Sequence, residues 1–117
     1  MNTIKQIIQR VDEMKPNAFS PQTKLEWIAE LDGKIAVDVH LAHHVELTQP
    51  RYQYPEGLDL VPLVKFPHDA LYDKWLIAQI DAANEEWQRY ANNIEVFNSY
   101  YKDYVRWVAS RFAGGRQ

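Results

Sequence analysis

The sequence predicts an all-α protein: a small helical bundle with two N-terminal helices, a long proline-rich arm and a long C-terminal helix or helical hairpin. Three stretches place apolar residues three and four positions apart, which is the period of an amphipathic helix. The third stretch keeps this pattern across several heptads without a glycine or proline. Most of the six prolines fall together before it. We expect one domain, residues 1–117, in which residues 45–67 form the arm.

The composition is that of a soluble globular domain. Of the 117 residues, 46% are hydrophobic and 25% are charged. The formal net charge of −3 argues against nucleic acid as the main partner. The absence of cysteine excludes disulfides and thiolate chemistry. No apolar run approaches the ~18 residues of a membrane span, so we expect neither a nucleic acid nor a membrane as a partner.

The first predicted helix is short and has one apolar face, which consists of Ile4, Ile7, Ile8 and Val11. Asn2 or Thr3 is the expected N-cap. Pro16 ends the helix because it restricts the residue before it. A helix of this length is marginal alone in water, so it must dock on another element.

The second predicted helix begins at Ser20-Pro21, a hydroxyl cap followed by proline at the first helical position. Its apolar face consists of Leu25, Ile28, Leu31, Ile35 and Val39. Asp32 falls within this face rather than opposite it. Because an unpaired buried carboxylate is costly, we expect Asp32 to accept hydrogen bonds from a neighbouring helix or loop.

The proline-rich arm interrupts the helical pattern with Pro50, Pro55, Pro62 and Pro67. A stretch this long without helix is unusual in a compact domain. It also carries many apolar residues, so we expect it to pack on its own helices or on a neighbouring subunit. Leu58–Val64 has the composition of a short strand, which Pro62 would confine to a sheet edge.

The long C-terminal stretch, Asp69 to Phe112, carries most of the chain's aromatic residues. Its apolar stripe consists of Leu76, Ile80, Ala83, Trp87, Tyr90, Ile94, Phe97, Tyr101, Tyr104 and Val108. One continuous helix would be roughly 65 Å long, too long for a compact domain of this size. Either the stretch folds back, with Asn92-Asn93 as the expected bend, or it projects and is covered by other subunits.

Two further expectations concern this stretch. Acidic residues early and basic residues late suit the dipole of a single helix and favour a continuous one. We expect the first half to pack on the two N-terminal helices, and the aromatic end, Tyr100 to Phe112, to meet other subunits.

Catalytic and metal sites are not expected. His40 and His44 are four apart, so on a helix they could share a metal ion, with Asp38 or His68 as a further ligand. However, no glutamate lies between them, so the H-E-x-x-H motif is missing, and histidines at a helix end are favourable without a metal. The chain also lacks a P-loop, a G-x-G-x-x-G motif and a G-x-S-x-G motif. We therefore predict no enzymatic activity, no metal and no cofactor.

The aromatic residues have three interpretations: helix-packing core, a protein interface, or stacking platforms for single-stranded nucleic acid. The last needs a basic groove, which suits this acidic chain poorly. Tyrosine and tryptophan are enriched at interface centres, and here they occupy more than one helical face. The predicted interface residues are Tyr52, Tyr54, Tyr100, Tyr101, Tyr104, Trp107 and Phe112.

Packing motifs over nearly the whole chain resemble those of small proteins from tailed phages and prophages of Gram-positive bacteria. In the C-terminal half these motifs are Leu71-Tyr72, Ala78-Gln79-Ile80-Asp81, Asn84-Glu85, Arg89-Tyr90, Asn92-Asn93, Phe97-Asn98, Tyr101 and Trp107. In the N-terminal half they are Lys15-Pro16-Asn17, Ser20-Pro21, Trp27-Ile28 and Leu31-Asp32-Gly33. These proteins are similar to head–tail connector (adaptor) proteins, small helical subunits that form a ring beneath the portal.

The resemblance implies a non-enzymatic structural subunit that forms a homo-oligomer, such as a ring, at the portal–tail junction. The implied partners are the portal and tail-completion proteins, and the implied location is the virion, or the host cytoplasm during assembly. Other small head-completion or tail-completion proteins share the same sequence texture. A helical interaction or regulatory module that acts as a dimer is the alternative function.

Overall fold

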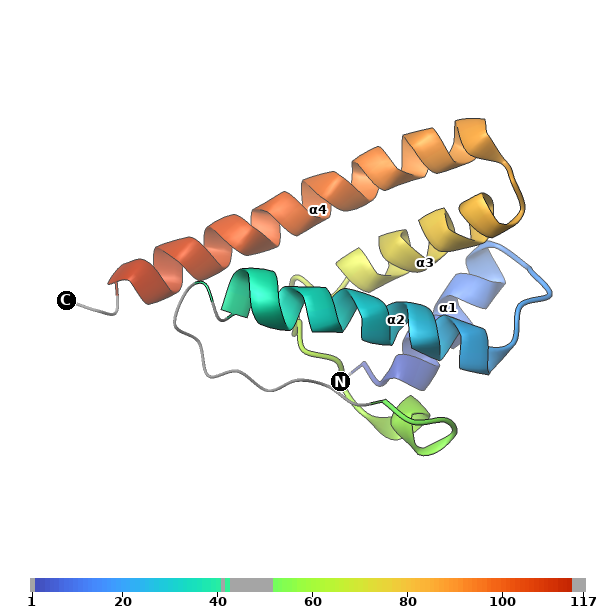
Figure 1. Cartoon of the computed structure of the whole chain (residues 1–117), viewed down its shortest axis with the longest axis horizontal. Helices are drawn as coiled ribbons and strands as arrows, with labels where there is room; N and C mark the ends of the chain where they lie inside the picture. Colours follow the sequence, from blue (N-terminus) through green and yellow to red (C-terminus); the bar gives the residue numbers. More distant parts are fainter. Residues whose placement is uncertain (1, 41, 43–51, 115–117) are drawn as a thin grey trace.

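The computed structural model describes residues 2–40, 42 and 52–114, and no strand occurs in this part of the chain. The prediction of an all-α fold is therefore confirmed. The elements, shown in Figure 1, are α1 (Ile4–Met14), α2 (Pro21–Ile35), the π-helical turn η1 (Ala36–His40), the 3₁₀ turn η3 (Glu56–Asp59), α3 (Leu71–Ala83) and α4 (Trp87–Gly114).

Helix α1 begins with a capping box. The Thr3 hydroxyl accepts a hydrogen bond from the Gln6 N–H at 3.2 Å, and the Gln6 side chain accepts one from the Thr3 N–H at 2.9 Å. Of the two predicted caps, Thr3 is therefore the one used. The predicted apolar face is buried as expected, and it consists of Ile4, Ile7, Ile8 and Val11.

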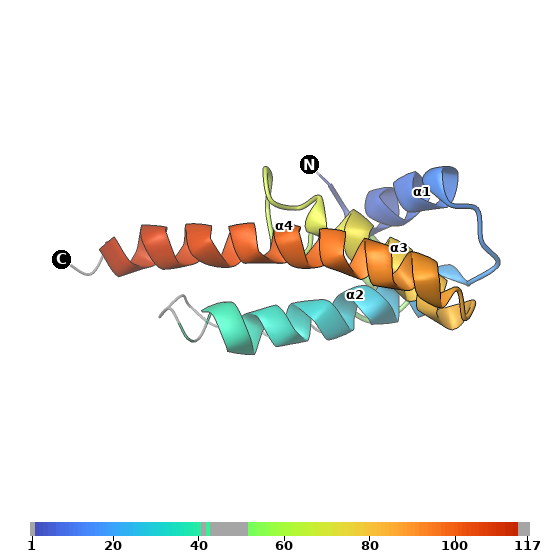
Figure 2. The same cartoon turned by 90° about the horizontal axis from the view of Figure 1, so that it is seen from above.

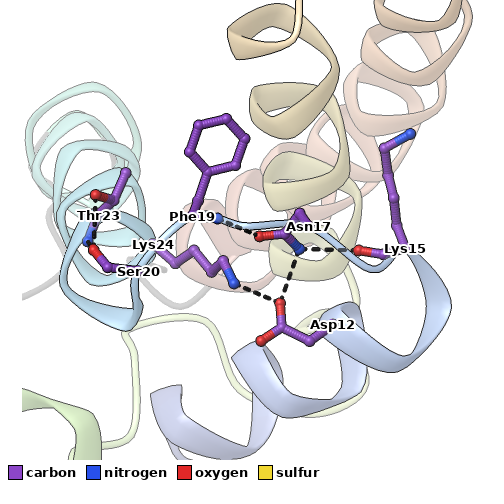
Figure 3. A network of polar contacts seen from close by, with 7 residues as sticks. All are labelled: Asp12, Lys15, Asn17, Phe19, Ser20, Thr23 and Lys24. Carbon is purple, nitrogen blue, oxygen red and sulfur yellow. Dashed lines mark hydrogen bonds and ion pairs between the residues drawn. The ribbon is translucent and has the colours of Figure 1, made fainter.

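Polar contacts hold the corner between α1 and α2 (Figure 3). The Asn17 amide donates to Asp12 Oδ1 at 3.0 Å and to the Lys15 carbonyl at 2.9 Å. Lys24 is buried, and its ammonium donates to the same Asp12 oxygen at 2.6 Å. The Ser20 hydroxyl caps α2 by accepting a hydrogen bond from the Thr23 N–H at 3.1 Å, as its sequence position predicts. The corner therefore fixes how α2 leaves α1.

Buried apolar side chains from α1, α2 and α3 form most of the core. Helix α3 contacts both N-terminal helices, as predicted for the first half of the C-terminal stretch. The Trp75 indole N–H, for example, donates to the Trp27 carbonyl of α2 at 2.9 Å. Helix α4 closes the core along one side with Phe97, Tyr104 and Val108.

The C-terminal stretch folds back as a hairpin, but not at the expected place. Helix α3 ends at Ala83 and α4 begins at Trp87, whereas Asn92-Asn93 lie inside α4. The bend expected there is wrong, and so is the preference for a continuous helix. The turn occurs where Glu85 takes a left-handed conformation, with φ of 58°. Asn93 instead joins the two arms of the hairpin, since its amide donates to Asp81 Oδ2 at 2.7 Å.

The arm packs on the protein's own helices over the part that the structure describes, which begins at Tyr52. Its Leu60 carbonyl accepts from the Ile4 N–H at 2.9 Å, and Val64 is buried in the core. The strand considered for Leu58–Val64 is not formed: the segment opens in η3 and continues through bends at Leu60, Leu63 and Val64. Residues 45–51 of the predicted arm lie outside the described residues.

Asp32 is the anchor of the arm. Its carboxylate, fully buried, accepts from the Tyr52 hydroxyl at 2.5 Å, the Tyr72 hydroxyl at 2.5 Å and the Leu63 N–H at 3.1 Å. Burial raises the pKa of Asp32, and its three hydrogen bonds oppose that rise. The expectation that Asp32 bonds to a neighbouring helix or loop is confirmed: Tyr72 lies on α3, and Tyr52 and Leu63 lie on the arm.

The molecule is long and flat, with principal extents of 49 × 33 × 21 Å. Helix α4 runs its full length and extends past the ends of α2 and α3 (Figure 1). Seen from above, α2 lies on one side of α4, and α1 lies on the other together with the chain that leads into α3 (Figure 2). The C-terminal end of α4 therefore projects beyond the other helices.

Candidate interaction surface

Large apolar side chains are exposed along one side of α4. Val96, Tyr100 and Trp107 are each 39–40% exposed, and their spacing of four and seven places them on one helical face. Phe66, in the chain before α3, is 85% exposed and lies with Trp107 at the rim of a shared hollow. We call these four residues the aromatic flank.

The hollow has a volume of about 200 Å³ and opens beside the C-terminal half of α4. It is lined by His40, Leu63, Lys65, Phe66, His68, Tyr104, Trp107 and Val108. Its walls are mostly rings: His68 lies 5.1 Å from Trp107 between ring centroids, and Tyr104 stacks on Trp107 at 6.0 Å. A cavity of about 150 Å³ holds benzene in another protein, so this hollow has room for one ring from a partner.

Two buried groups at the base of the hollow are paired with each other. His40 Nε2 lies 2.6 Å from the Tyr104 hydroxyl. Burial lowers the pKa of His40, and mainly burial raises the pKa of Tyr104 to about 12. Both groups are therefore neutral near pH 7 and form a neutral hydrogen bond.

The suggested histidine metal site is not assembled in the described part of the chain. His40 is engaged with Tyr104, Asp38 is exposed, and His44 lies outside the described residues. Nowhere among residues 2–40, 42 and 52–114 do three His, Cys, Asp or Glu side chains gather as metal ligands would.

Two basic side chains lie at the hollow. Lys65 lines it, and the Arg111 guanidinium lies 5.4 Å from the centre of the Trp107 ring, a cation–π arrangement. Lys102 and Arg106 are also exposed on this half of α4, but the helical period places them on other faces than the hollow-lining Tyr104, Trp107 and Val108. The surface therefore combines aromatic rings with positive charge.

The predicted interface residues do not form one surface. Tyr100 and Trp107 lie on the aromatic flank, and Tyr54 is 46% exposed on the arm. The other members point inward or are not described: Tyr52 bonds to Asp32, Tyr101 stacks on Phe97 at 5.6 Å, Tyr104 is buried, and the side chain of Phe112 lies outside the described residues.

Sequence reasoning missed two members of the flank. Phe66 is one of the apolar residues of the arm, which the sequence predicts to pack on the protein's own helices or on a neighbouring subunit, and nothing in its neighbours distinguishes it from Val64, which is buried. Val96 lies one position before the stripe residue Phe97. Its signal was available: with Tyr100 and Trp107 it forms a second apolar stripe beside the first.

No family model, no curated protein and no solved structure matches the chain. In the described residues, no helix is both long enough and apolar enough to cross a membrane.

Proposed function

We propose that the protein is a non-enzymatic structural subunit of a tailed phage or prophage, a head–tail connector (adaptor) that assembles with copies of itself at the portal–tail junction. The observation that carries this proposal is the aromatic flank beside an open, ring-lined hollow. Exposed apolar surface of this kind marks interaction sites in soluble proteins. The resemblance of the packing motifs supplies the class of assembly.

The size of the flank is compatible with a stable contact. Each aromatic side chain buries on the order of 150–250 Å² when it is covered. A standard interface takes about 800 Å² from each partner. Phe66 is 85% exposed and would contribute most of its surface, whereas Tyr100 and Trp107, 39–40% exposed, would contribute less than half of theirs. The flank would therefore supply part of one side, and Lys65 and Arg111 would belong to its polar rim.

The polar groups of the hollow support recognition rather than catalysis. His40, the most buried base there, is bonded to Tyr104 and is shielded from protonation by burial. A general base needs an accessible nitrogen beside the proton that it removes. In the proposed role the partners are further copies of the chain, the portal protein and tail-completion proteins, in the virion or in the host cytoplasm during assembly.

Composition of purified particles tests this proposal. Virions from an induced lysogen should contain the chain in a fixed ratio to the portal protein, and cryo-electron microscopy should show it as a ring at the portal–tail junction. A chain that is absent from virions and that co-purifies with a host protein would instead support the dimeric interaction or regulatory module.

A further inference from the structure

We propose that the basic hollow of one copy receives the opposite end of a second copy, through the corner between α3 and α4. This corner consists of Glu85, Glu86 and Trp87, and we call it the acidic corner. The inference rests on the self-association in the proposed function and names the two surfaces that meet.

The corner presents a large ring with little cover. Trp87 is the first residue of α4 and is 60% exposed. Its one ring neighbour among the described residues is Tyr90, which it meets edge-on at 6.1 Å between centroids. An exposed tryptophan at a turn is well placed to enter a partner, and the hollow lined by Phe66, Tyr104 and Trp107 has room for a ring.

The backbone of Glu85 ends α3, with the Glu85 N–H donating to the Ala82 carbonyl at 3.0 Å, but its side chain has no role in that turn. Its φ of 58° lies in the left-handed region, where a residue with a Cβ is disfavoured relative to glycine. Its carboxylate is exposed and has no ionic partner in the described part of the chain. Glycine would suit the turn better, so the turn does not require a carboxylate here. A basic partner outside the subunit would use it.

The charges of the two ends are complementary. At the corner, the Glu86 carboxylate forms ion pairs with Arg89 at 3.4 Å and Lys15 at 3.7 Å, whereas Glu85 forms none among the described side chains. At the hollow, Lys65 and Arg111 are exposed and neither makes an ion pair among the described side chains; the Lys65 ammonium donates to the Pro62 carbonyl and is attracted to the buried Asp32, and Arg111 lies over the Trp107 ring. Opposite charges that face each other steer association and fix its register. A two-fold pairing of hollow with hollow would instead bring Lys65 and Arg111 against their own copies.

The two surfaces lie at opposite ends of the molecule. In Figure 1 the α3–α4 turn is at the right and the C-terminal end of α4 is at the left, along the axis of 49 Å. Contacts between unlike ends are heterologous, and they make a ring when the rotation closes. Each copy would thus offer one corner and one hollow.

Complementary variants test the pairing. The change Glu85→Lys with Trp87→Ser disables the corner and leaves the hollow intact. The change Lys65→Glu with Arg111→Glu disables the hollow and leaves the corner intact. By sedimentation at low salt, each variant alone should be monomeric, and a mixture should form a 1:1 complex and nothing larger. Wild-type protein should form larger species that weaken as salt is added.

A matched control and a fold check accompany this test. Glu30→Lys on the exposed side of α2 alters the charge as Glu85→Lys does, and it should associate like wild type. All the altered side chains are exposed, so circular dichroism should show every variant folded. Lys65→Glu loses the attraction to the buried Asp32 and should lower the melting temperature modestly, whereas the other changes should not alter it appreciably.

The inference is overturned if either variant associates like wild type, if the mixture stays monomeric while wild type associates, or if wild type itself is monomeric at all concentrations. The proposed function is judged separately, by the presence of the wild-type chain in purified virions. If the chain is present in virions but the two variants do not form a complex, the proposed function stands and the copies must meet through other surfaces.

Discussion

The Asp32 carboxylate shows how one residue can organise a segment that has little regular structure of its own. Its two oxygens accept from Tyr52, Tyr72 and the Leu63 N–H. Tyr72 in turn accepts from the Val64 N–H at 2.9 Å. The arm therefore satisfies its backbone on side chains of α2 and α3 rather than on a neighbouring strand.

Replacing Asp32 with alanine should destabilise the protein by about 3 kcal/mol or more, because it leaves three donors without an acceptor in the interior. Tyr52→Phe removes one of these donors with its bond and should cost only about 1 kcal/mol. Urea unfolding followed by circular dichroism measures both. Equal losses for the two variants would mean that Asp32 does not act as the common acceptor.

Stability should fall in mild acid because of His40. Burial lowers its folded-state pKa below the ordinary value of 6.5, so below about pH 6.5 the unfolded chain binds a proton that the folded one does not. This contribution is complete above pH 6.5 and is lost as the pH falls toward the folded-state pKa. Melting temperatures between pH 8 and pH 5 should therefore drop less in His40→Gln than in wild type. Parallel curves would show that another group is responsible.

At the scale of elements, the position of the α3–α4 turn is the feature that sequence reasoning could not find. Glycine and proline normally mark such a turn, and Asn84-Glu85-Glu86 contains neither. The apolar spacing also passes through the turn unbroken, since Ala83 and Trp87 keep the helical period although both are exposed. A periodic pattern shows which residues share a helical face, but it does not show whether they belong to one helix or to two.

Glu85 should tolerate glycine better than valine. Glu85→Gly relieves the left-handed strain but adds freedom to the unfolded chain, so stability should change by less than about 1 kcal/mol. Glu85→Val puts a β-branched residue at a positive φ and should cost more than about 1 kcal/mol. Thermal unfolding of the three proteins gives the order. A stable valine variant would contradict the left-handed turn.

Helix α4 should show a sharp contrast between its first residue and its middle. Trp87 is 60% exposed and Phe97 is 5% exposed. Trp87→Ala should therefore stay within about 0.5 kcal/mol of wild type, while Phe97→Ala should cost about 3 kcal/mol or more through the cavity that it leaves. Denaturant midpoints compare them directly, and a large loss for Trp87→Ala would place that ring in the core.

For the whole molecule, the sequence was sufficient for the fold class, the two N-terminal helices and the role of Asp32, because each rests on local periodicity or on the cost of an unpaired charge. The hollow could not be predicted from the sequence. His40, Phe66 and Trp107 come from η1, from the chain before α3 and from α4, and only the return of the arm brings them together. No local pattern reports such a meeting.

Phe66 should separate assembly from folding. At 85% exposure its replacement by serine removes no core contact, so the melting temperature should hold while self-association weakens at least tenfold. Leu60→Ser, at 48% exposure on the arm, is the control and should affect neither. Sedimentation measures the self-association of each variant, and thermal unfolding of the same samples measures its stability. Unchanged association of Phe66→Ser would remove the aromatic flank from the contact.

The hairpin also has a mechanical consequence. Helix α4 is 28 residues long, roughly 42 Å at about 1.5 Å per residue, and it is pinned near its start by Asn93 and Asp81. Asp81 in turn meets Lys15 of the α1 corner at 2.7 Å. From Asn93 to the end of α4 is about 32 Å, so a tilt of about 5° at this pivot would move the far end by roughly 3 Å. The contacts of Lys15, Asp81 and Asn93 thus help to set the direction in which α4 leaves the turn, and with it the position of the hollow.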